Sequence, residues 1–166
     1  MSAGTAMGID LGLVSTGGGN AQMPLGFIHT VPAGVDGEGE KTYIYVSTVA
    51  SINTALGLAR AGTTYGGVTL SGLTEDSRLV GITINDMTDA TLGVAAGTRR
   101  FGFVQRTGIA TVTGAGAVGD VATCVAGGSL DVLNAIAGAP PAMDVDQQGV
   151  GTYLDAGTTV NLWCRG

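Results

Sequence analysis

The sequence predicts an all-β protein, a small barrel or sandwich of short antiparallel strands. Glycine makes up 30 of the 166 residues, and only 12% of the residues are charged. Thr and Val, which favour strands, fill much of the remainder, while long helix-forming side chains are few. Strand-like runs recur about every ten residues with glycine-rich turns between them, the spacing of a barrel or sandwich. A chain of this length fits one domain.

The first 22 residues differ in composition from the rest of the chain. They are Gly, Ser, Ala and Thr with scattered apolar residues, and they keep neither a period of 2 nor one of 3.6. We therefore expect a flexible N-terminal arm over residues 1–22 and a single β-barrel-like domain over residues 23–166. The start has no basic region followed by an apolar core, so a signal peptide is not expected.

The first half of the domain contains four candidate strands. Leu25 to Val31 is an expected edge strand, and residues 66–73 are strand-like. Residues 51–62 are ambiguous and could hold one or two helical turns, although their glycines disfavour a longer helix. The two clearest strands alternate: residues 42–48 place Ile44 and Val46 opposite Tyr43 and Tyr45, and residues 77–86 place Val80, Ile82 and Ile84 opposite Thr83 and Asn85.

The second half begins with a long β run over residues 99–113, neither face of which stays apolar throughout. A bend near Thr107–Gly108 would restore the alternation. Residues 119–127 predict a further strand, Ser129 could cap a helical turn, and Pro140–Pro141 predict a loop. The closing strand alternates: Val160, Leu162 and Cys164 lie on one face, and Asn161, Trp163 and Arg165 on the other.

One stretch resembles a dinucleotide-binding turn. Gly114, Gly116 and Gly119 spell G-x-G-x-x-G after a β-like run. That motif functions because the loop runs into a helix whose N-terminus binds the pyrophosphate. Here the next residues alternate and reach Gly127–Gly128, which is too short and too strand-like for that helix. The sequence predicts a turn between two strands.

Other catalytic or metal-binding patterns are weak. His29 is the only histidine, and no serine lies in a G-x-S-x-G motif. Cys124 and Cys164 predict two ordinary thiols, although a disulfide is left open, and zinc would require both together with His29. The acidic clusters at 36–40 and 144–149 predict solvated turns rather than a calcium site. We expect no enzyme activity, no cofactor and no metal.

Charge and hydropathy restrict the partners. The formal net charge is −6, and Arg99–Arg100 is the only adjacent basic pair, which argues against nucleic-acid binding. No apolar run reaches the length of a membrane span. Tyr43, Tyr45 and Trp163 lie opposite the aliphatic residues of their strands, which makes them candidates for a subunit or capsid contact. The alternative is that these aromatics pack inside the chain, on the second side of a sheet.

Four segments, taken in order, carry a resemblance to a known family. They are a Pro-Leu-Gly start, Asp-Gly turn and aromatic strand (residues 24–52), a Val-Gly-Ile strand followed by a Phe-Gly-Phe-Val-Gln strand (77–112), a turn with Gly-Asp opening a strand (114–128), and a Gly-Thr-x-Leu-Asp segment with a terminal strand (150–166). In this order they resemble the small decoration (cement) proteins of tailed-phage capsids. Residues 54–70 depart from the pattern, because the usual Gly-Asp turn is missing there.

The resemblance implies a structural role. It implies a β-barrel-like body with an N-terminal arm, assembled as a homotrimer on the outer capsid surface of the virion after synthesis in the host cytoplasm. Its partner would be the major capsid protein, whose subunits it would bridge against the pressure of the internal DNA. The alternative is a phage fibre or host-attachment module.

Overall fold

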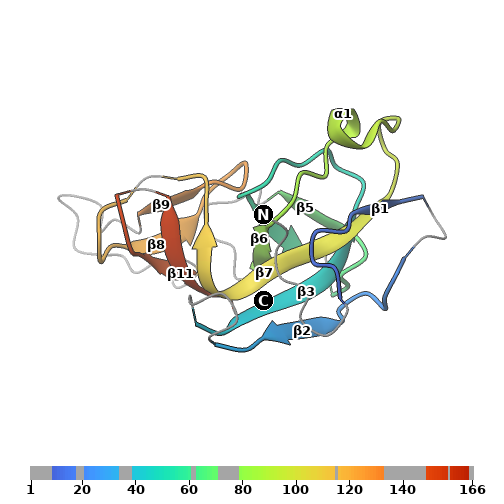
Figure 1. Ribbon diagram of the computed structural model, residues 1–166. Coiled ribbons are helices and arrows are strands. Elements are labelled where there is room, and N and C mark those ends of the chain that lie inside the picture. Colours follow the sequence, from blue (N-terminus) through green and yellow to red (C-terminus); the bar gives the residue numbers. More distant parts are fainter. Residues whose placement is uncertain are drawn as a thin grey trace.

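The computed structural model confirms the all-β prediction (Figure 1). It describes residues 9–17, 21–33, 39–60, 63–70, 79–114, 116–132, 149–156 and 158–164. Within these residues the strands form one curled antiparallel sheet. The strands are β1 (Ser15–Thr16), β2 (Ile28–Val31), β3 (Lys41–Thr48), β4 (Gly57–Arg60), β5 (Val68–Leu70), β6 (Leu79–Thr83), β7 (Arg100–Thr111), β8 (Val121–Cys124), β9 (Leu130–Val132), β10 (Gly151–Tyr153) and β11 (Thr159–Trp163).

Strand β7 belongs to both halves of the molecule, one formed with strands β1 to β6 and the other with strands β8 to β11 (Figure 1). Its first part pairs with β3, and its last part, from Thr107 to Thr111, pairs with β11. The register with β3 skips Arg106, and Gly108 follows with φ of +87°. A Cβ at Gly108 would lie 2.5 Å from the carbonyl oxygen of Glu40, so only glycine fits this bend. The predicted bend near Thr107–Gly108 is confirmed.

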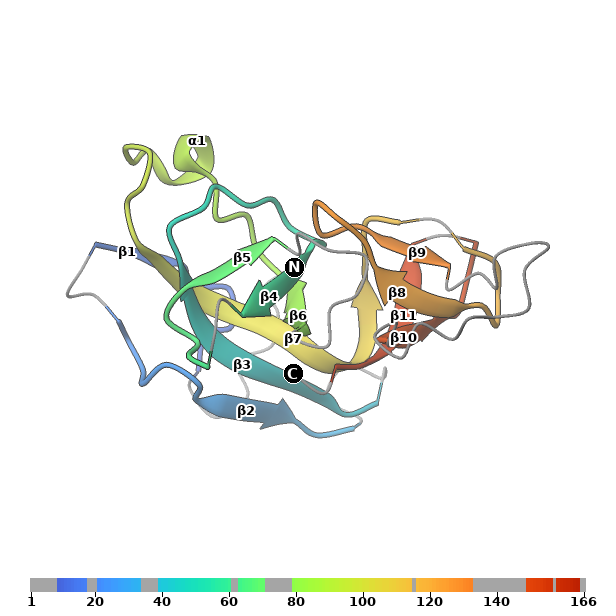
Figure 2. The same cartoon turned by 180° about the vertical axis from the view of Figure 1, so that it is seen from behind.

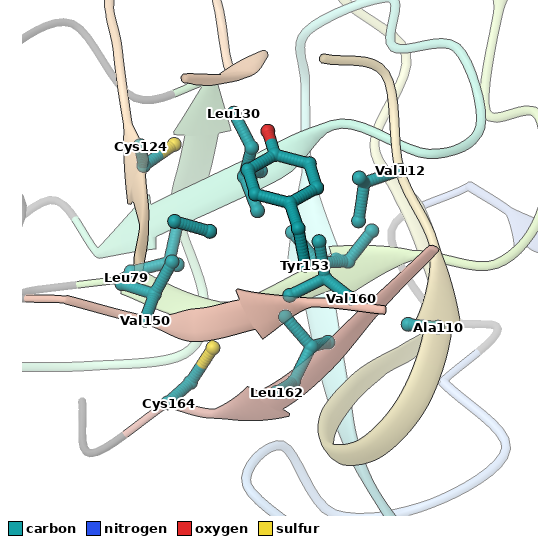
Figure 3. Close-up of a cluster of buried hydrophobic side chains, with 12 residues drawn as sticks. Leu79, Ala110, Val112, Cys124, Leu130, Val150, Tyr153, Val160, Leu162 and Cys164 are labelled. Carbon is teal, nitrogen blue, oxygen red and sulfur yellow. The ribbon is translucent and has the colours of Figure 1, made fainter. Parts of the chain in front are cut away.

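The C-terminal strands curl back onto the end of β7 (Figure 2). From β7 the order runs through β11, β10 and β8 to β9. Leu130 of β9 then bridges to Gly114, and its amide donates to the Thr113 carbonyl at 2.8 Å. The enclosed space holds a cluster centred on the fully buried Tyr153 (Figure 3). We call this the C-terminal cluster; it contains Leu79, Ile82, Ala110, Val112, Ala122, Cys124, Leu130, Val150, Tyr153, Val160, Leu162 and Cys164.

Strand β3 has a separate core on each face. Ile44 and Val46 join an aliphatic cluster with residues of β4, β5, β6 and β7. Tyr43 and Tyr45 join an aromatic cluster that contains Leu11, Val31, Phe101 and Phe103. The Tyr45 ring lies tilted against Phe103 with 5.1 Å between centroids, a favourable edge geometry. The predicted alternation along this strand is correct, but both of its faces are buried.

The segment from Ile9 to Gly17, which we call the N-terminal strap, packs on the aromatic cluster. Its Leu11 is 1% exposed, and β1 within it pairs with the start of β7. The side-chain amide of Asn85 donates to the Leu11 carbonyl at 3.0 Å. A flexible arm over residues 1–22 is therefore wrong for residues 9–17, because the strap covers apolar surface. Residues 1–8 and 18–20 lie outside the described residues.

Two segments that could hold helical turns contain strands instead. Part of the ambiguous segment 51–62 forms β4, and the turn expected after Ser129 is β9. Each strand gains ladder partners outside its own segment, β5 and β6 for the first and β8 for the second, which local propensity does not report. The predicted edge strand is confirmed over residues 28–31, which pair with β3.

A short helix, α1 (Asp89–Leu92), stands over the start of β7. The Thr88 hydroxyl caps it by accepting from the Thr91 amide at 3.0 Å. Arg100 connects this helix to the sheet: it is fully buried, pairs with Asp89, and donates to the carbonyls of Val49 and Ala50. The adjacent basic pair is thus divided between a buried Arg100 and an exposed Arg99.

Candidate interaction site

The G-x-G-x-x-G stretch packs against a tyrosine ring. A Cβ on Gly116 would lie 2.4 Å from the Tyr153 ring, and one on Gly114 would lie 2.7 Å from the Tyr153 hydroxyl oxygen. Gly119 has φ of +89°, and strand β8 follows it. The dinucleotide site needs a helix N-terminus at this place, and a strand cannot supply its free amides. The predicted turn between two strands is confirmed.

The histidine and the two cysteines do not meet as a site. His29 lies on β2, 8% exposed, between the exposed Ile28 and Thr30. Cys124 and Cys164 are buried in the C-terminal cluster and form no disulfide, and burial raises the pKa of Cys164 to about 12. Across the described ranges, no three His, Cys, Asp or Glu side chains gather where they could hold a metal ion. Residues 36–38 and 144–148, the greater part of the two acidic clusters, lie outside those ranges.

The three aromatic contact candidates have different surroundings. Tyr43 and Tyr45 are 6% and 2% exposed, so this chain already covers them. Two backbone segments cover Tyr45 directly: its hydroxyl accepts from the Gln22 amide at 3.1 Å and lies 3.4 Å from the Ser15 hydroxyl. For these two tyrosines the structure shows the alternative, packing inside the chain on the second side of the sheet. Trp163 is 37% exposed and is the one of the three with surface to offer a partner.

Trp163 is held in place on the outer side of the C-terminal sheet. Its indole Nε1 donates to the Gly149 carbonyl at 3.0 Å, and its backbone amide donates to Val150. A Cβ on Gly149 would lie 2.6 Å from Val121 and 3.8 Å from the Trp163 ring. The backbone of Gly149 therefore lies between the side chains of Val121 and Trp163, and glycine has no side chain that would push them apart.

More exposed apolar residues continue this surface. Thr152 of β10 pairs with Val121 on one side and with Asn161 on the other, so these three side chains point to one face. Leu154, two positions beyond Thr152, points the same way and is exposed. The turn before β8 adds Val118, next to the Gly119 amide that donates to the Tyr153 carbonyl. We call this surface the C-terminal outer face; its apolar members are Val118, Val121, Leu154 and Trp163.

Carboxylates close to this face are engaged in turns. Asp120 accepts from the Ala117 amide at 2.9 Å. Asp155 accepts from the hydroxyl of Thr159 and from the amides of Thr158 and Thr159, and these hydrogen bonds lower the pKa of its carboxyl group. The face is therefore apolar with an acidic margin. Such a surface can exclude water against a partner.

The fold and this face define a class, an all-β protein with an apolar surface set on a rigid sheet. Comparisons with protein-family models, with curated proteins and with solved structures found no match for the chain. Among the described residues, no helix is both long enough and apolar enough to cross a bilayer.

Proposed function

We propose that this protein is a structural decoration (cement) protein on the outer surface of a phage capsid. It bridges major capsid subunits and stabilises the head against internal DNA pressure. The C-terminal outer face carries the proposal: a half-exposed tryptophan, fixed by a hydrogen bond, sits among exposed aliphatic residues on a sheet. Interfaces concentrate their binding energy in such aromatic anchors. The resemblance over residues 24–166 supplies the identity of the partner.

The mechanism is adhesion. A decoration protein needs a stiff body and a contact surface, and it needs no titrating group. In a homotrimer, as the resemblance implies, three copies of the face act together, so that once one contact forms, the others bind at a high effective concentration. Capsid subunits held in this way resist separation because all of the linked contacts must break.

The test uses undecorated phage heads and the purified full-length protein. Wild-type protein should co-sediment with heads to saturation and raise the temperature at which they release DNA. Trp163→Ala should weaken binding about tenfold or more, as loss of an interface anchor does. Leu13→Ala, which truncates another exposed apolar side chain on the strap, should bind as wild type.

Two results would contradict the proposal. One is an unchanged release temperature for fully decorated heads. The other is equal binding by Trp163→Ala, provided that thermal unfolding shows the variant to be folded. Electron micrographs of labelled particles are an independent test, because protein confined to the tail or to one vertex would favour a fibre or attachment module.

A further inference from the structure

A second surface forms where two segments meet along the outer edge of β3. Strand β2 covers the first part of this edge, and the Gly26 amide then donates to the Tyr45 carbonyl at 2.8 Å. Farther along, the Ser47 amide donates to the Tyr65 carbonyl at 2.9 Å. The two segments therefore lie end to end. A Cβ on Gly26 would lie 2.8 Å from the Tyr65 ring, and one on Gly66 would lie 3.4 Å from the Leu25 side chain.

Two guanidinium groups flank this junction. The Cζ atom of Arg60 lies 5.2 Å from the centroid of the Tyr65 ring. Arg99 donates from Nη1 to the Gly66 carbonyl at 3.2 Å and approaches the Ser47 hydroxyl at 3.5 Å. In the part of the chain that the structure describes, neither arginine pairs with a carboxylate, whereas Arg100 pairs with Asp89. Both therefore keep N–H donors for an external acceptor.

Exposed apolar side chains run from the junction onto β2. Leu25, Phe27 and Ile28 are 39%, 36% and 51% exposed. Strand β2 pairs with β3 alone among the described strands, so its outer edge presents backbone groups to which an extended segment could hydrogen-bond. The junction thus combines apolar contact area, two cations with spare donors and an open strand edge.

We propose that this junction surface, formed by Leu25, Phe27, Arg60, Tyr65 and Arg99, binds an extended acidic segment of a partner protein. Carboxylates of the segment pair with the two guanidinium groups, and its apolar residues cover Leu25 and Phe27. Charge complementarity selects this occupant: the chain carries a net charge of −6, whereas this junction holds two guanidinium groups that pair with no carboxylate among the described residues. Two arginines are too few for nucleic-acid binding, which neutralises many phosphates. The inference does not depend on a capsid role.

The experiment measures binding of a short fluorescein-labelled peptide of alternating Glu and Leu by fluorescence anisotropy. The same peptide with Lys in place of Glu is the ligand control. The full-length protein should bind the Glu peptide, more weakly as salt is added, and should not bind the Lys peptide. Arg60→Gln and Arg99→Gln should each weaken binding about threefold, as expected for exposed ion pairs. Leu25→Ser should also weaken it.

Matched variants separate a local effect from a change in net charge. Arg106→Gln removes the same charge, but Arg106 lies on β7 seven residues after Arg99, which immediately precedes that strand, or about 23 Å away at the rise of a strand. It should bind the peptide as wild type does, and so should Leu154→Ser on the C-terminal outer face. The proposal is overturned if the Glu peptide does not bind, if Arg106→Gln weakens binding as much as Arg99→Gln, or if a single-stranded oligonucleotide binds more tightly than the peptide.

Discussion

At the residue scale, the glycines of the G-x-G-x-x-G stretch serve packing and turn geometry. Gly116 lies against the ring of Tyr153, and Gly119 takes a left-handed conformation before β8. The same letters in a nucleotide-binding protein let the backbone approach a phosphate. Here the backbone approaches an aromatic side chain of its own core.

Gly116→Ala should lower the free energy of unfolding by about 1–3 kcal/mol, because the new methyl group overlaps the Tyr153 ring. Gly67→Ala is the matched control: no atom lies within 4 Å of its Cβ position, so its stability should be close to that of wild type. Urea unfolding of the two variants checks the prediction. Equal stabilities would show that the stretch does not pack as described.

The carboxyl group of Asp155, in the β10–β11 turn, should make the stability of the fold depend on pH. Hydrogen bonds from the Thr159 hydroxyl, and then from the amides of Thr158 and Thr159, lower its pKa in the folded protein. A lowered pKa means that the carboxylate stabilises the fold above its ordinary pKa of 3.8 and that this contribution is lost as the pH falls through the folded-state value. Asp155→Asn should therefore be less stable than wild type at neutral pH, and the difference should vanish in acid. Urea unfolding across the acid range measures this difference in stability. A difference that persists in acid would refute the role given to the Asp155 carboxylate.

The sequence predicted some residue environments correctly and missed others. The outward position of Trp163 followed from the alternation of β11 with Val160 and Leu162. Tyr43 and Tyr45 were left undecided because alternation distinguishes two faces but does not reveal that the strap covers the second face of β3. Buried Arg100 was missed because its partners, Asp89 and two carbonyls near residue 50, become neighbours only in the fold.

At the scale of elements, the strap is the clearest departure from expectation. Its composition resembles a linker, yet the buried Leu11, the hydrogen bond from Asn85 and the pairing of β1 with β7 fix it to the body. Long strands were predicted well, since β3, β6, β7 and β11 each show several alternating or apolar positions. The short strands β4 and β9 were not predicted, because three or four residues carry no usable period and depend on ladder partners outside their own segments.

Leu11→Ala should lower the free energy of unfolding by about 2–5 kcal/mol, the cost of a cavity in a packed site. Leu13→Ala, on the same strap but 45% exposed, should change it by no more than about 0.5 kcal/mol. Thermal and urea unfolding provide the comparison. Similar effects for the two variants would mean that the strap does not seal the aromatic cluster.

At the scale of the whole molecule, β7 joins the two halves without a linker. The C-terminal cluster also includes Leu79 and Ile82 of β6, so its side chains come from both halves. We therefore expect the two halves to unfold together.

The buried thiols test this expectation. The variants Cys124→Ala and Cys164→Ala each keep one of the two thiols. At neutral pH the remaining thiol should react with a thiol reagent only when the fold opens, because both thiols are buried. The Cys164 thiol, with its pKa of about 12, also stays protonated. Their labelling rates should be similar, and adding Gly116→Ala should accelerate both in proportion to its loss of stability. Fast labelling of one thiol alone would show that part of the sheet opens independently.

A continuous β7 also fixes the distance between the two surfaces. Arg99 immediately precedes this strand, and Trp163 pairs with Thr107 within it, so about 25 Å of hydrogen-bonded backbone separates the two anchors. Two partners bound at the junction surface and at the C-terminal outer face would be held at a single spacing. If both proposed surfaces are occupied, the protein binds two partners at that spacing and cannot engage both at any other spacing.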